Sequence, residues 1–396
     1  MSQPGHLRFG TFIPPIHPNW ENPTLSMERD MQLIVHLDTL GFDEAWIGEH
    51  HSAGAEVIAS PELIIAAVAE RTKRIKLGTG VSSLPYHHPL ILADRLLQLH
   101  HMTRGRAMLG CGPGALVSDA MMMGLNPERQ RDMMEESLDC IVRLFRGETV
   151  TKKTDWFELK DARLQIAPYG GEMIEIATAC VVSPSGPRAA GKFGTGLMSL
   201  GGTSPENLAA APAHWQTAND MAAKHGNTMN RKDWRMVCAV HVAETREQAF
   251  EQVKFGLQDW VDYFGDVATH PMVPKDVAGD PAGHLTRTGR VVIGSPDDCI
   301  RQIERLVEAT GGFGCFLITD TNWARFEDKL KSYELVARYV FPAFQNLTGG
   351  LKASRQWVAE AHDGFQGKAL AAQQAQILRH AAEKAAADTA KGKAAE

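Results

Sequence analysis

The chain has 396 residues, of which 44% are hydrophobic and 22% are charged, and its formal net charge is -6. This composition is typical of a soluble globular enzyme, and the dispersed basic residues form no cluster of the kind that binds nucleic-acid phosphates. No apolar run approaches the roughly 20 residues that span a bilayer, and the N-terminus MSQPGHLRFG lacks the basic and apolar regions of a signal peptide. We therefore expect a cytoplasmic protein with no nucleic-acid or membrane partner.

Short runs rich in apolar and β-branched residues alternate along the chain with amphipathic segments of helical length. Eight such repeats predict a parallel sheet covered by helices, and favour a single (β/α)8 TIM barrel over a doubly wound sheet. The predicted strands are 8–13, 44–48, 74–81, 106–110, 174–179, 196–200, 236–243 and 314–318. Between them, apolar positions recur every three or four residues and predict helices, for example at 25–41, 61–72, 89–103 and 127–147.

Two insertions and a tail break this rhythm, and the predicted barrel domain is residues 1–349. Residues 151–172 are aromatic and alternating, which indicates a small hairpin or an extended insertion. Residues 264–290 are rich in Pro, Gly and Asp and poor in periodicity, and we expect a lid loop over an active site there. Residues 350–396 are rich in Ala, Gln and Lys and are expected to form a helical tail. This tail either frays in solution or contacts another subunit.

The segment WIGEHHSAG, residues 46–54, places a carboxylate and two imidazoles directly after the second predicted strand. Active sites of barrels lie at the C-terminal ends of the strands, so His50 and His51 are expected at the mouth. A zinc site needs further ligands there, but the other strand ends offer none, and we expect no metal. His50 is then a candidate acid, base or anion stabiliser. The alternative for either histidine is a hydrogen bond to a loop carbonyl.

Glycines gather at the ends of the third and fourth predicted strands. In LGTGVSSLPYHHP, residues 77–89, they indicate either a flat ligand lying on the strand or a simple bulge. LGCGPGALVSDAMMMG, residues 109–124, lacks the dinucleotide-binding spacing, but its loop is a candidate to pass close to a cofactor. Asp119 within it points either to the mouth or to solvent. The methionines 121–123 are interpreted as core or pocket lining.

A phosphate site is predicted after the fifth strand, in VVSPSGPRAAGKFG at 181–194. Free N–H groups at a helix N-terminus bind phosphate, and serine hydroxyls with Arg188 add donors and charge. The alternative is plain N-capping by Ser183 or Ser185. GSPDD at 294–298 is similar, but its acidic first turn favours capping alone. The six cysteines form no CxxC pair, and we expect most of them to be small buried hydrophobes.

Several of these segments together resemble the bacterial luciferase-like monooxygenases. They are RFGTFIPP at 8–15, GFDEAWIGEHHS at 41–52, IKLGTGVSSLPYHHPL at 75–90, TRGRAMLGCGPGAL at 103–116 and GSPDDCIRQIERL at 294–306. The likeness covers about residues 7–345. Within it, GEHHSAG, SLPYHHP and GPGALVSDA are similar to the limonene 1,2-monooxygenase-like branch. The family fold is a (β/α)8 barrel that uses reduced flavin and oxygen.

The resemblance also implies roles for single residues. His50 matches the family's catalytic histidine, and Asp119 matches an aspartate beside it. Gly80 and Val81 fall where luciferase has a non-prolyl cis peptide next to the flavin ring, whereas Pro113 replaces an arginine of the family. The implied cofactor-binding residues are Thr79, Gly80, Val81, Gly112, Ser183, Ser185, Gly186 and Arg188. The implied substrate pocket is His51, Tyr86, Met121 and Met122.

The implied function is a monooxygenase that uses reduced FMN, or else FAD, and forms a flavin C4a-hydroperoxide. Its substrate is expected to be a small apolar molecule, such as the monoterpene limonene. The implied partners are a separate NAD(P)H-dependent flavin reductase and a second copy of the chain in a homodimer. Two alternatives stay open: an oxidoreductase of the same superfamily that uses a deazaflavin, and a non-catalytic flavin-binding subunit.

Overall fold

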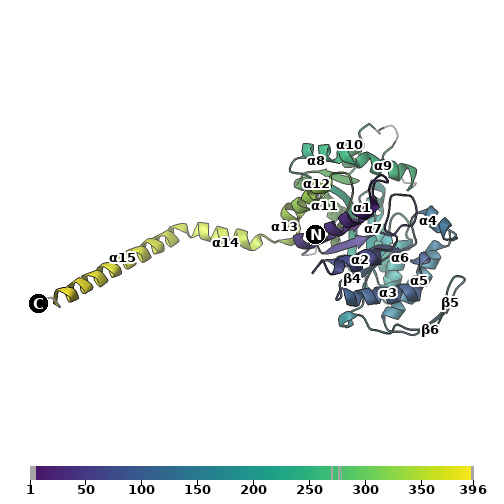
Figure 1. Cartoon of the computed structure of the whole chain (residues 1–396), viewed down its shortest axis with the longest axis horizontal. Helices are drawn as coiled ribbons and strands as arrows, with labels where there is room; N and C mark the ends of the chain where they lie inside the picture. The colour runs from purple at the N-terminus through teal and green to yellow at the C-terminus, as the bar shows by residue number, and fades with distance from the viewer. Residues whose placement is uncertain (1–5, 269–270, 275–276, 278, 394–396) are drawn as a thin grey trace. The chain divides into compact units, whose positions relative to one another are not determined.

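A computed structural model describes residues 6–268, 271–274, 277 and 279–393 of the chain. All eight predicted strands are present, and they run parallel around a closed barrel (Figure 1), so the TIM-barrel prediction is confirmed. Parallel pairing between β8 (Gly196–Ser199) and β9 (Trp234–Val242) closes the ring. The barrel strands are β1 (Arg8–Ile13), β2 (Glu44–Ile47), β3 (Lys76–Ser83), β4 (Ala107–Gly112), β7 (Glu175–Cys180), β8 (Gly196–Ser199), β9 (Trp234–Val242) and β11 (Cys315–Thr319).

The structure adds a strand that the sequence pattern did not indicate, β10 (Val291–Gly294). It pairs in parallel with the C-terminal part of β9, from Ala239 to Val242. The four residues of β10 are all buried, so they lack the alternation of a half-exposed strand. The sequence pattern predicts eight strands, whereas the described part of this sheet has nine.

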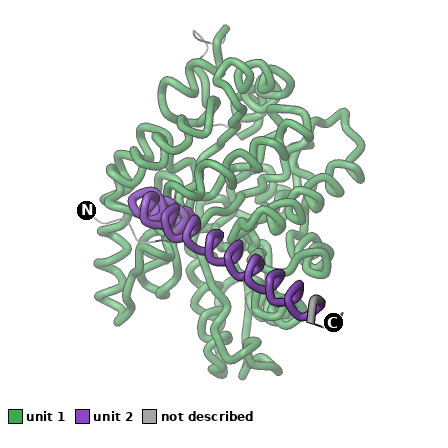
Figure 2. The backbone as a smooth tube through the Cα atoms, turned by 90° about the vertical axis from the view of Figure 1, so that its left-hand side faces the viewer, with its two compact units in different colours: residues 1–345 green, residues 346–396 purple. Residues whose placement is uncertain are grey.

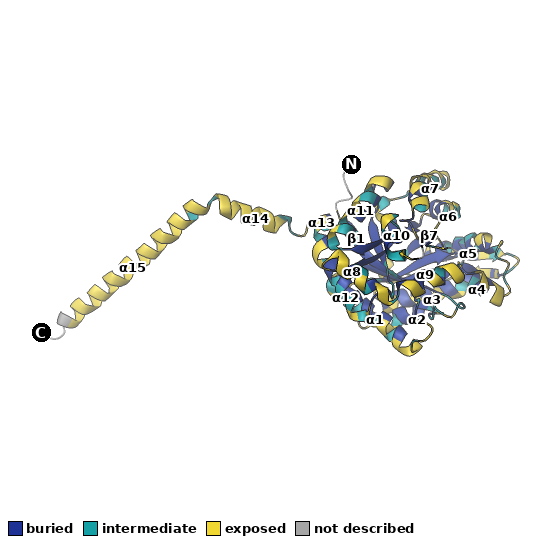
Figure 3. Cartoon of the chain, turned by 90° about the horizontal axis from the view of Figure 1, so that it is seen from above, coloured by how far each residue is buried: buried dark blue, intermediate teal, exposed yellow. Residues whose placement is uncertain are grey.

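Helices follow the barrel strands and cover the outside of the barrel. They commonly start at Pro after a polar residue and end at a left-handed Gly, the asymmetry expected for helix ends. The surrounding helices are α1 (Pro23–Leu40), α2 (Pro61–Ala69), α3 (Pro89–Met102), α5 (Gln130–Phe145), α6 (Ser185–Phe193), α7 (Pro205–His225), α11 (Pro296–Thr310) and α12 (Phe326–Leu335). Shorter helices are α4 (Val117–Met122), α8 (Arg246–Gln252), α9 (Leu257–Asp266), α10 (Pro281–Arg287) and α13 (Phe341–Gln345). Figure 3 shows buried residues along the strands and exposed residues on the outer faces of the helices.

The two predicted insertions have different structures. Residues 151–172 contain an antiparallel hairpin of β5 (Val150–Lys153) and β6 (Glu158–Ala162). The segment 264–290 is not a plain loop, because the end of α9 and the whole of α10 lie within it. Residues 269–270, 275–276 and 278 of that segment lie outside the described residues. Its role as a lid stays a prediction.

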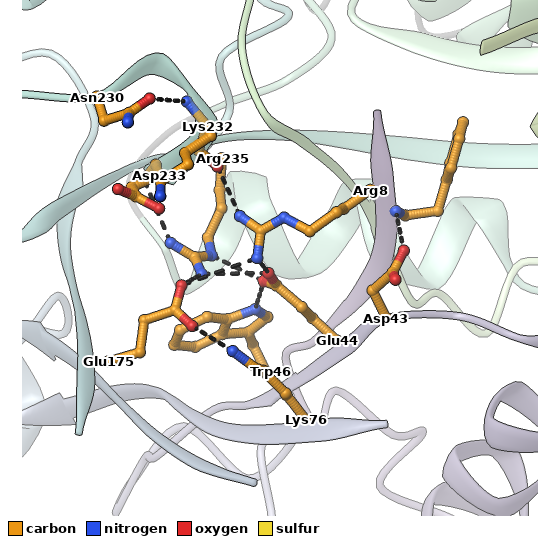
Figure 4. Close-up of polar contacts among 11 residues, drawn as sticks. Arg8, Asp43, Glu44, Trp46, Lys76, Glu175, Asn230, Lys232, Asp233 and Arg235 are labelled. Atoms are coloured by element: carbon orange, nitrogen blue, oxygen red, sulfur yellow. Dashed lines mark hydrogen bonds and ion pairs between the residues drawn. The ribbon is translucent and has the colours of Figure 1, made fainter. Parts of the chain in front are cut away.

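An ion-pair network around the buried residues Glu44 and Arg235 lies at the N-terminal end of the barrel (Figure 4). Arg235 at the start of β9 is fully buried, and its Nε lies 2.7 Å from Oε2 of Glu44 at the start of β2. The second carboxylate, Glu175, pairs with Arg235 and lies 2.8 Å from Lys76 Nζ. Arg8 also pairs with Glu44. Because five strand starts supply these charges, the network ties the barrel together at the end opposite the mouth.

Residues 1–345 and 346–396 form two compact units (Figure 2). The second unit consists of α14 (Gly349–Glu360) and α15 (His362–Lys393). Most of its described side chains are exposed, including Trp357 and Ile377. Fraying of this tail in solution and its contact with another subunit both stay predictions.

Candidate active site

His50 lies at the C-terminal end of β2, where the chain leaves the barrel wall. Its Nδ1 lies 2.9 Å from Oδ2 of Asp119 in α4. The other carboxylate oxygen of Asp119 accepts from the backbone N–H of His51, at 3.2 Å, and from the hydroxyl of Ser52. Asp119 is fully buried, so its side chain faces the site and not the solvent. The structure therefore brings together the two residues predicted to be catalytic.

The electrostatics of this pair favour an ionised carboxylate and a charged imidazole. Burial of Asp119 opposes ionisation, but hydrogen bonds from His50 and Ser52 outweigh it and hold the pKa of Asp119 below its usual value. Burial of His50 opposes the imidazolium, but the hydrogen bond to Asp119 and the charge of Glu56 outweigh it and raise the pKa of His50. An ionised Asp119 accepts only, so Nδ1 of His50 carries a proton.

Glu49 organises the histidines on the other side of the loop. Its Oε1 lies 3.0 Å from Nε2 of His51 and 2.8 Å from Nε2 of His87, and its Oε2 accepts from the backbone N–H of Ser83. The hydrogen bond to Glu49 is the largest cause that raises the pKa of His51. Each histidine of the EHH motif thus has a carboxylate as its partner, and not the loop carbonyl of the alternative interpretation.

Tyr86 stands next to His51, as expected for two members of one pocket. The ring centroids are 5.8 Å apart with an edge-on geometry. The phenol oxygen of Tyr86 accepts from Nε2 of Gln130 at 3.3 Å. Burial raises the pKa of Tyr86 to about 12, so the hydroxyl keeps its proton at neutral pH. It offers a hydrogen-bond donor beside His51.

The predicted cradle for the flavin ring lies at the ends of β3 and β4. The Gly80–Val81 peptide bond is cis, as the resemblance implies, and the pairing register between β3 and β4 shifts here. A Cβ on Gly80 would lie 2.8 Å from Cβ of Trp46, and one on Gly112 would lie 2.8 Å from Cγ2 of Val81. Strand packing therefore accounts for these glycines and supports the bulge interpretation, while a ligand lying on the strand stays a prediction.

Thr79 is placed differently from the other predicted cofactor residues. Its hydroxyl is fully buried and lies 3.0 Å from the carbonyl oxygen of Gly110, tying β3 to β4. Thr79 as a whole is buried, and its role in cofactor binding stays a prediction.

The predicted phosphate site is the N-terminus of α6, next to the end of β7. Ser183 and Ser185 lie together, with 3.1 Å between their hydroxyl oxygens, and the N–H of Ser185 donates to Oγ of Ser183 at 3.3 Å. A Cβ on Gly186 would lie 2.3 Å from the carbonyl oxygen of Ala179, so glycine lets the helix end approach β7. Arg188 is exposed on the first turn. Hydroxyls, helix amides and a guanidinium are a donor set that suits a phosphate group.

Three other expectations for side chains have clear outcomes. Met121 and Met122 are each 70% exposed, so the core interpretation is wrong; α4 is a short helix whose buried face is taken by Asp119 and Ala120. The expectation for the cysteines is confirmed, because all six are buried. Burial raises the pKa of Cys111 to about 12, in line with a small buried side chain. Capping by GSPDD is also confirmed, since Ser295 and Asp298 form a reciprocal capping box.

The sequence patterns missed two residues of the site, Glu56 and Tyr263. Oε2 of Glu56 lies 3.3 Å from Nε2 of His50, and the hydroxyl of Tyr263 donates to Oε1 of Glu56. Glu56 follows the EHH motif by a few residues, which was the one available signal. Tyr263 is 207 residues further on, and no spacing rule connects the two.

A pocket of about 300 Å³ lies beside Tyr263, between the loops after β1 and β2 and helix α9. Its described lining includes Ile16, Trp20, Ala55, Phe255, Trp260 and Tyr263. The four residues predicted to form the substrate pocket are not among its described lining residues. Across the described parts of the chain, no group of three or more His, Cys, Asp or Glu side chains is placed to hold a metal ion. No helix among the described residues is long and apolar enough to cross a membrane.

The family model described as luciferase-like monooxygenase matches residues 7–312. The chain belongs to this family. The match includes the β2 loop with His50, the cis peptide of β3 and the first turn of α6. The luciferase-like chain is 46% identical over 345 residues to limonene 1,2-monooxygenase of Rhodococcus erythropolis, covering 87% of this chain and 88% of the relative.

A second relative has nearly the same likeness to this luciferase-like chain. It is 4-hydroxyprotoasukamycin monooxygenase of Streptomyces nodosus subsp. asukaensis, 45% identical over 361 residues, covering 89% of this chain and 96% of the relative. Among solved structures, the oxygenating constituent of 3,6-diketocamphane monooxygenase from Pseudomonas putida, a type II Baeyer-Villiger monooxygenase in complex with FMN, superposes with a TM-score of 0.70. That pair is 25% identical, and covers 85% of this chain and 98% of the other.

Proposed function

We propose that this protein is the oxygenating component of a two-component flavin monooxygenase. It would use O2 and reduced FMN, delivered by a separate NAD(P)H-dependent flavin reductase, to oxidise a small apolar molecule. The observation that carries the proposal is the Asp119–His50 pair, 2.9 Å apart at the barrel mouth. Oxygen activation through a flavin C4a-hydroperoxide, the chemistry that a reduced flavin supplies when bound, is part of this proposal.

The residues of the chain suit a mononucleotide flavin. Ser183, Ser185 and the first turn of α6 would bind the phosphate together with Arg188, and Val81 with Gly112 would face the ring. The ends of β3, β4 and β7 are neighbours in the sheet, so these two groups of residues belong to adjacent strand ends of the barrel. FAD is the second cofactor to test, since its additional nucleotide needs contacts beyond this set.

His50 is proposed as the acid/base group of the reaction. Asp119 holds the imidazole by Nδ1 and favours its charged form, so His50 can donate a proton or a hydrogen bond to an oxygen that becomes negative. His51 and Tyr86 would line the substrate side, with Met121 and Met122 at its exposed edge. In this arrangement the chain orients the substrate and handles protons.

A monoterpene such as limonene is the proposed substrate class, supported by the 46% identity to limonene 1,2-monooxygenase. The nearly equal identity to 4-hydroxyprotoasukamycin monooxygenase makes phenolic and larger substrates the comparison class. Assembly as a homodimer and a location in the cytoplasm complete the proposal.

The test is incorporation of oxygen from 18O2. Purified protein is mixed with photoreduced FMN and limonene, cyclic ketones or phenols under 18O2, and the products are analysed by mass spectrometry. The proposal requires one 18O atom in a product of at least one class, and its loss in His50→Ala. Equal product formation by His50→Ala would instead show that the reaction does not need His50, and labelled product at the level of a protein-free reaction would support a flavin-binding subunit without catalysis. Hydride transfer to a deazaflavin without oxygen uptake would overturn the oxygenase proposal.

A further inference from the structure

Both ring nitrogens of His50 face carboxylates. Nδ1 lies 2.9 Å from Asp119, and Nε2 lies 3.3 Å from Oε2 of Glu56. The imidazole side chain is 17% exposed. Because Asp119 already fixes the orientation of the ring, the second carboxylate is not needed to hold it. Glu56 therefore needs another role, one that explains why an ionisable group is buried beside Nε2, the ring nitrogen that Asp119 does not contact.

The backbone holds Glu56 firmly in place. Glu56 forms an isolated antiparallel bridge with Ile16 of the loop after β1. On either side, the N–H of His17 donates to the carbonyl of Ala55 at 2.9 Å, and the N–H of Val57 donates to that of Pro15 at 3.3 Å. The carboxyl group is thus aimed at His50 by two loops of the barrel mouth. Its position does not depend on a mobile side chain alone.

Tyr263 in α9 occupies the other oxygen of Glu56. Its hydroxyl donates to Oε1, and burial together with the charge of Glu56 raises the pKa of Tyr263. A phenol that keeps its proton is a donor to this oxygen. Oε2 is then the oxygen left to share a proton with Nε2 of His50.

We propose that Glu56 exchanges a proton with Nε2 of His50 during the reaction, and that Tyr263 positions Glu56 for this exchange. This inference rests on the proposed role of His50 as acid/base. In the forward step, the N–H bond at Nε2 of the imidazolium breaks and an O–H bond forms at Oε2 of the carboxylate. A cation and an anion become a neutral imidazole and a neutral carboxylic acid, and no electrons are transferred. His50 can then accept a proton from the reacting groups and return to its charged state.

The charges around the pair fit this exchange. His50 is faced by Asp119 from α4, by Glu56 and by Glu49 of its own loop, and Glu56 is faced by Tyr263 from α9 and by Asp119. Burial raises the pKa of Glu56, so this carboxyl binds a proton more readily than an exposed glutamate. Two interacting groups of this kind titrate as a coupled pair.

The test is a nuclear magnetic resonance titration of the flavin-free, full-length protein with 15N-labelled histidine. The His50 signals are assigned by their loss in His50→Gln. In the wild type we expect a two-step titration of His50, because the second step belongs to Glu56. Glu56→Gln should remove one step and lower the midpoint of His50. Asp259→Asn removes an exposed carboxylate on the same helix α9 as Tyr263 and should leave the curve unchanged.

Tyr263→Phe gives a second test that leaves every carboxylate in place. Loss of the hydrogen bond that favours ionised Glu56 should raise the midpoint of the step assigned to Glu56. A His50 curve that is identical in the wild type, Glu56→Gln and Tyr263→Phe, with circular dichroism spectra unchanged, would overturn the inference. In the loaded enzyme, Glu56→Gln should shift the pH profile of kcat and leave the Kd for FMN unchanged. A coupled titration without any oxygenase turnover would count against the proposed function and not against the pairing.

Discussion

Nδ1 of His50 and Oδ2 of Asp119 are 2.9 Å apart although 69 residues separate them in the chain. The contact arises because both residues follow barrel strands, His50 after β2 and Asp119 after β4, and all such segments emerge at the same end of the barrel. Substitutions at this pair test the proposed acid/base chemistry of the site.

Asp119→Asn keeps the size of the side chain and removes its charge. We expect the pKa of His50 to fall, because the anion that favours the imidazolium is lost, and turnover to fall by about 10²-fold, the lower range for acid/base groups. Turnover with reduced FMN and the histidine titration measure the two effects. Glu128→Gln, an exposed carboxylate beyond α4, is the matched control. Normal turnover in Asp119→Asn would show that the pair is structural.

Arg188→Ala should weaken FMN binding and spare riboflavin binding. A hydrogen bond to a charged group contributes about 1.5–3 kcal/mol, so the Kd for FMN should rise at least about tenfold. Riboflavin lacks the phosphate and serves as the internal comparison in the same fluorescence titration. Lys224→Ala, which removes an exposed cation at the end of α7, should change neither Kd. Equal weakening of both ligands would place Arg188 away from the phosphate.

Glu44→Gln should strongly destabilise the barrel. It removes one of the two carboxylates that pair with the fully buried guanidinium of Arg235, and removal of one partner from a buried ion pair costs about 3–5 kcal/mol. Glu158→Gln in the hairpin removes an ion pair with exposed Lys153 and should cost about 1 kcal/mol or less. Urea unfolding followed by circular dichroism compares the two. Similar urea midpoints for both variants would contradict a stabilising role of the ion pair between Glu44 and Arg235.

Acid should unfold the protein through the same network. Burial opposes ionisation of Glu175, but Arg235 and Lys76 outweigh it and lower the pKa of Glu175 to about 2. A lowered pKa in the folded state contributes stability that is fully present above the unfolded value of about 4.5. This contribution is lost as the pH falls from about 4.5 toward about 2. The free energy of unfolding should therefore decrease over this range in the wild type and decrease less in Glu175→Gln. Parallel curves would exclude Glu175 as a cause.

Periodicity was sufficient to predict the barrel from the sequence, because its strands and helices carry strong, repeated patterns. It failed at β10, where the four buried residues between α10 and α11 show no alternation. It also failed at 264–290, where a high content of Pro and Gly concealed α10. Helix propensity alone does not show which face of a helix is buried. In α4 the buried residues are Asp119 and Ala120, so Met121 and Met122 are exposed to solvent.

The site was predictable where a motif keeps its chemistry in one short segment. His50 and Asp119 were found because each follows a strand and because the EHH motif resembles a known family. Glu56 and Tyr263 were not found, since their contact joins the loop after β2 to helix α9, and only the closed barrel brings these segments together. The hydroxyl of Thr79 donates to the carbonyl oxygen of Gly110 within the barrel wall, a contact that the sequence alone did not indicate.

The central claim is that this chain activates oxygen with a bound reduced flavin. The most direct measurement is stopped-flow mixing of the protein and anaerobically reduced FMN with oxygen, recorded in the near ultraviolet and the visible range. We predict a long-lived near-ultraviolet band of a flavin hydroperoxide that precedes the return of oxidised FMN, and that decays faster when the substrate is present. Reoxidation of the flavin at the rate seen without protein would contradict the claim.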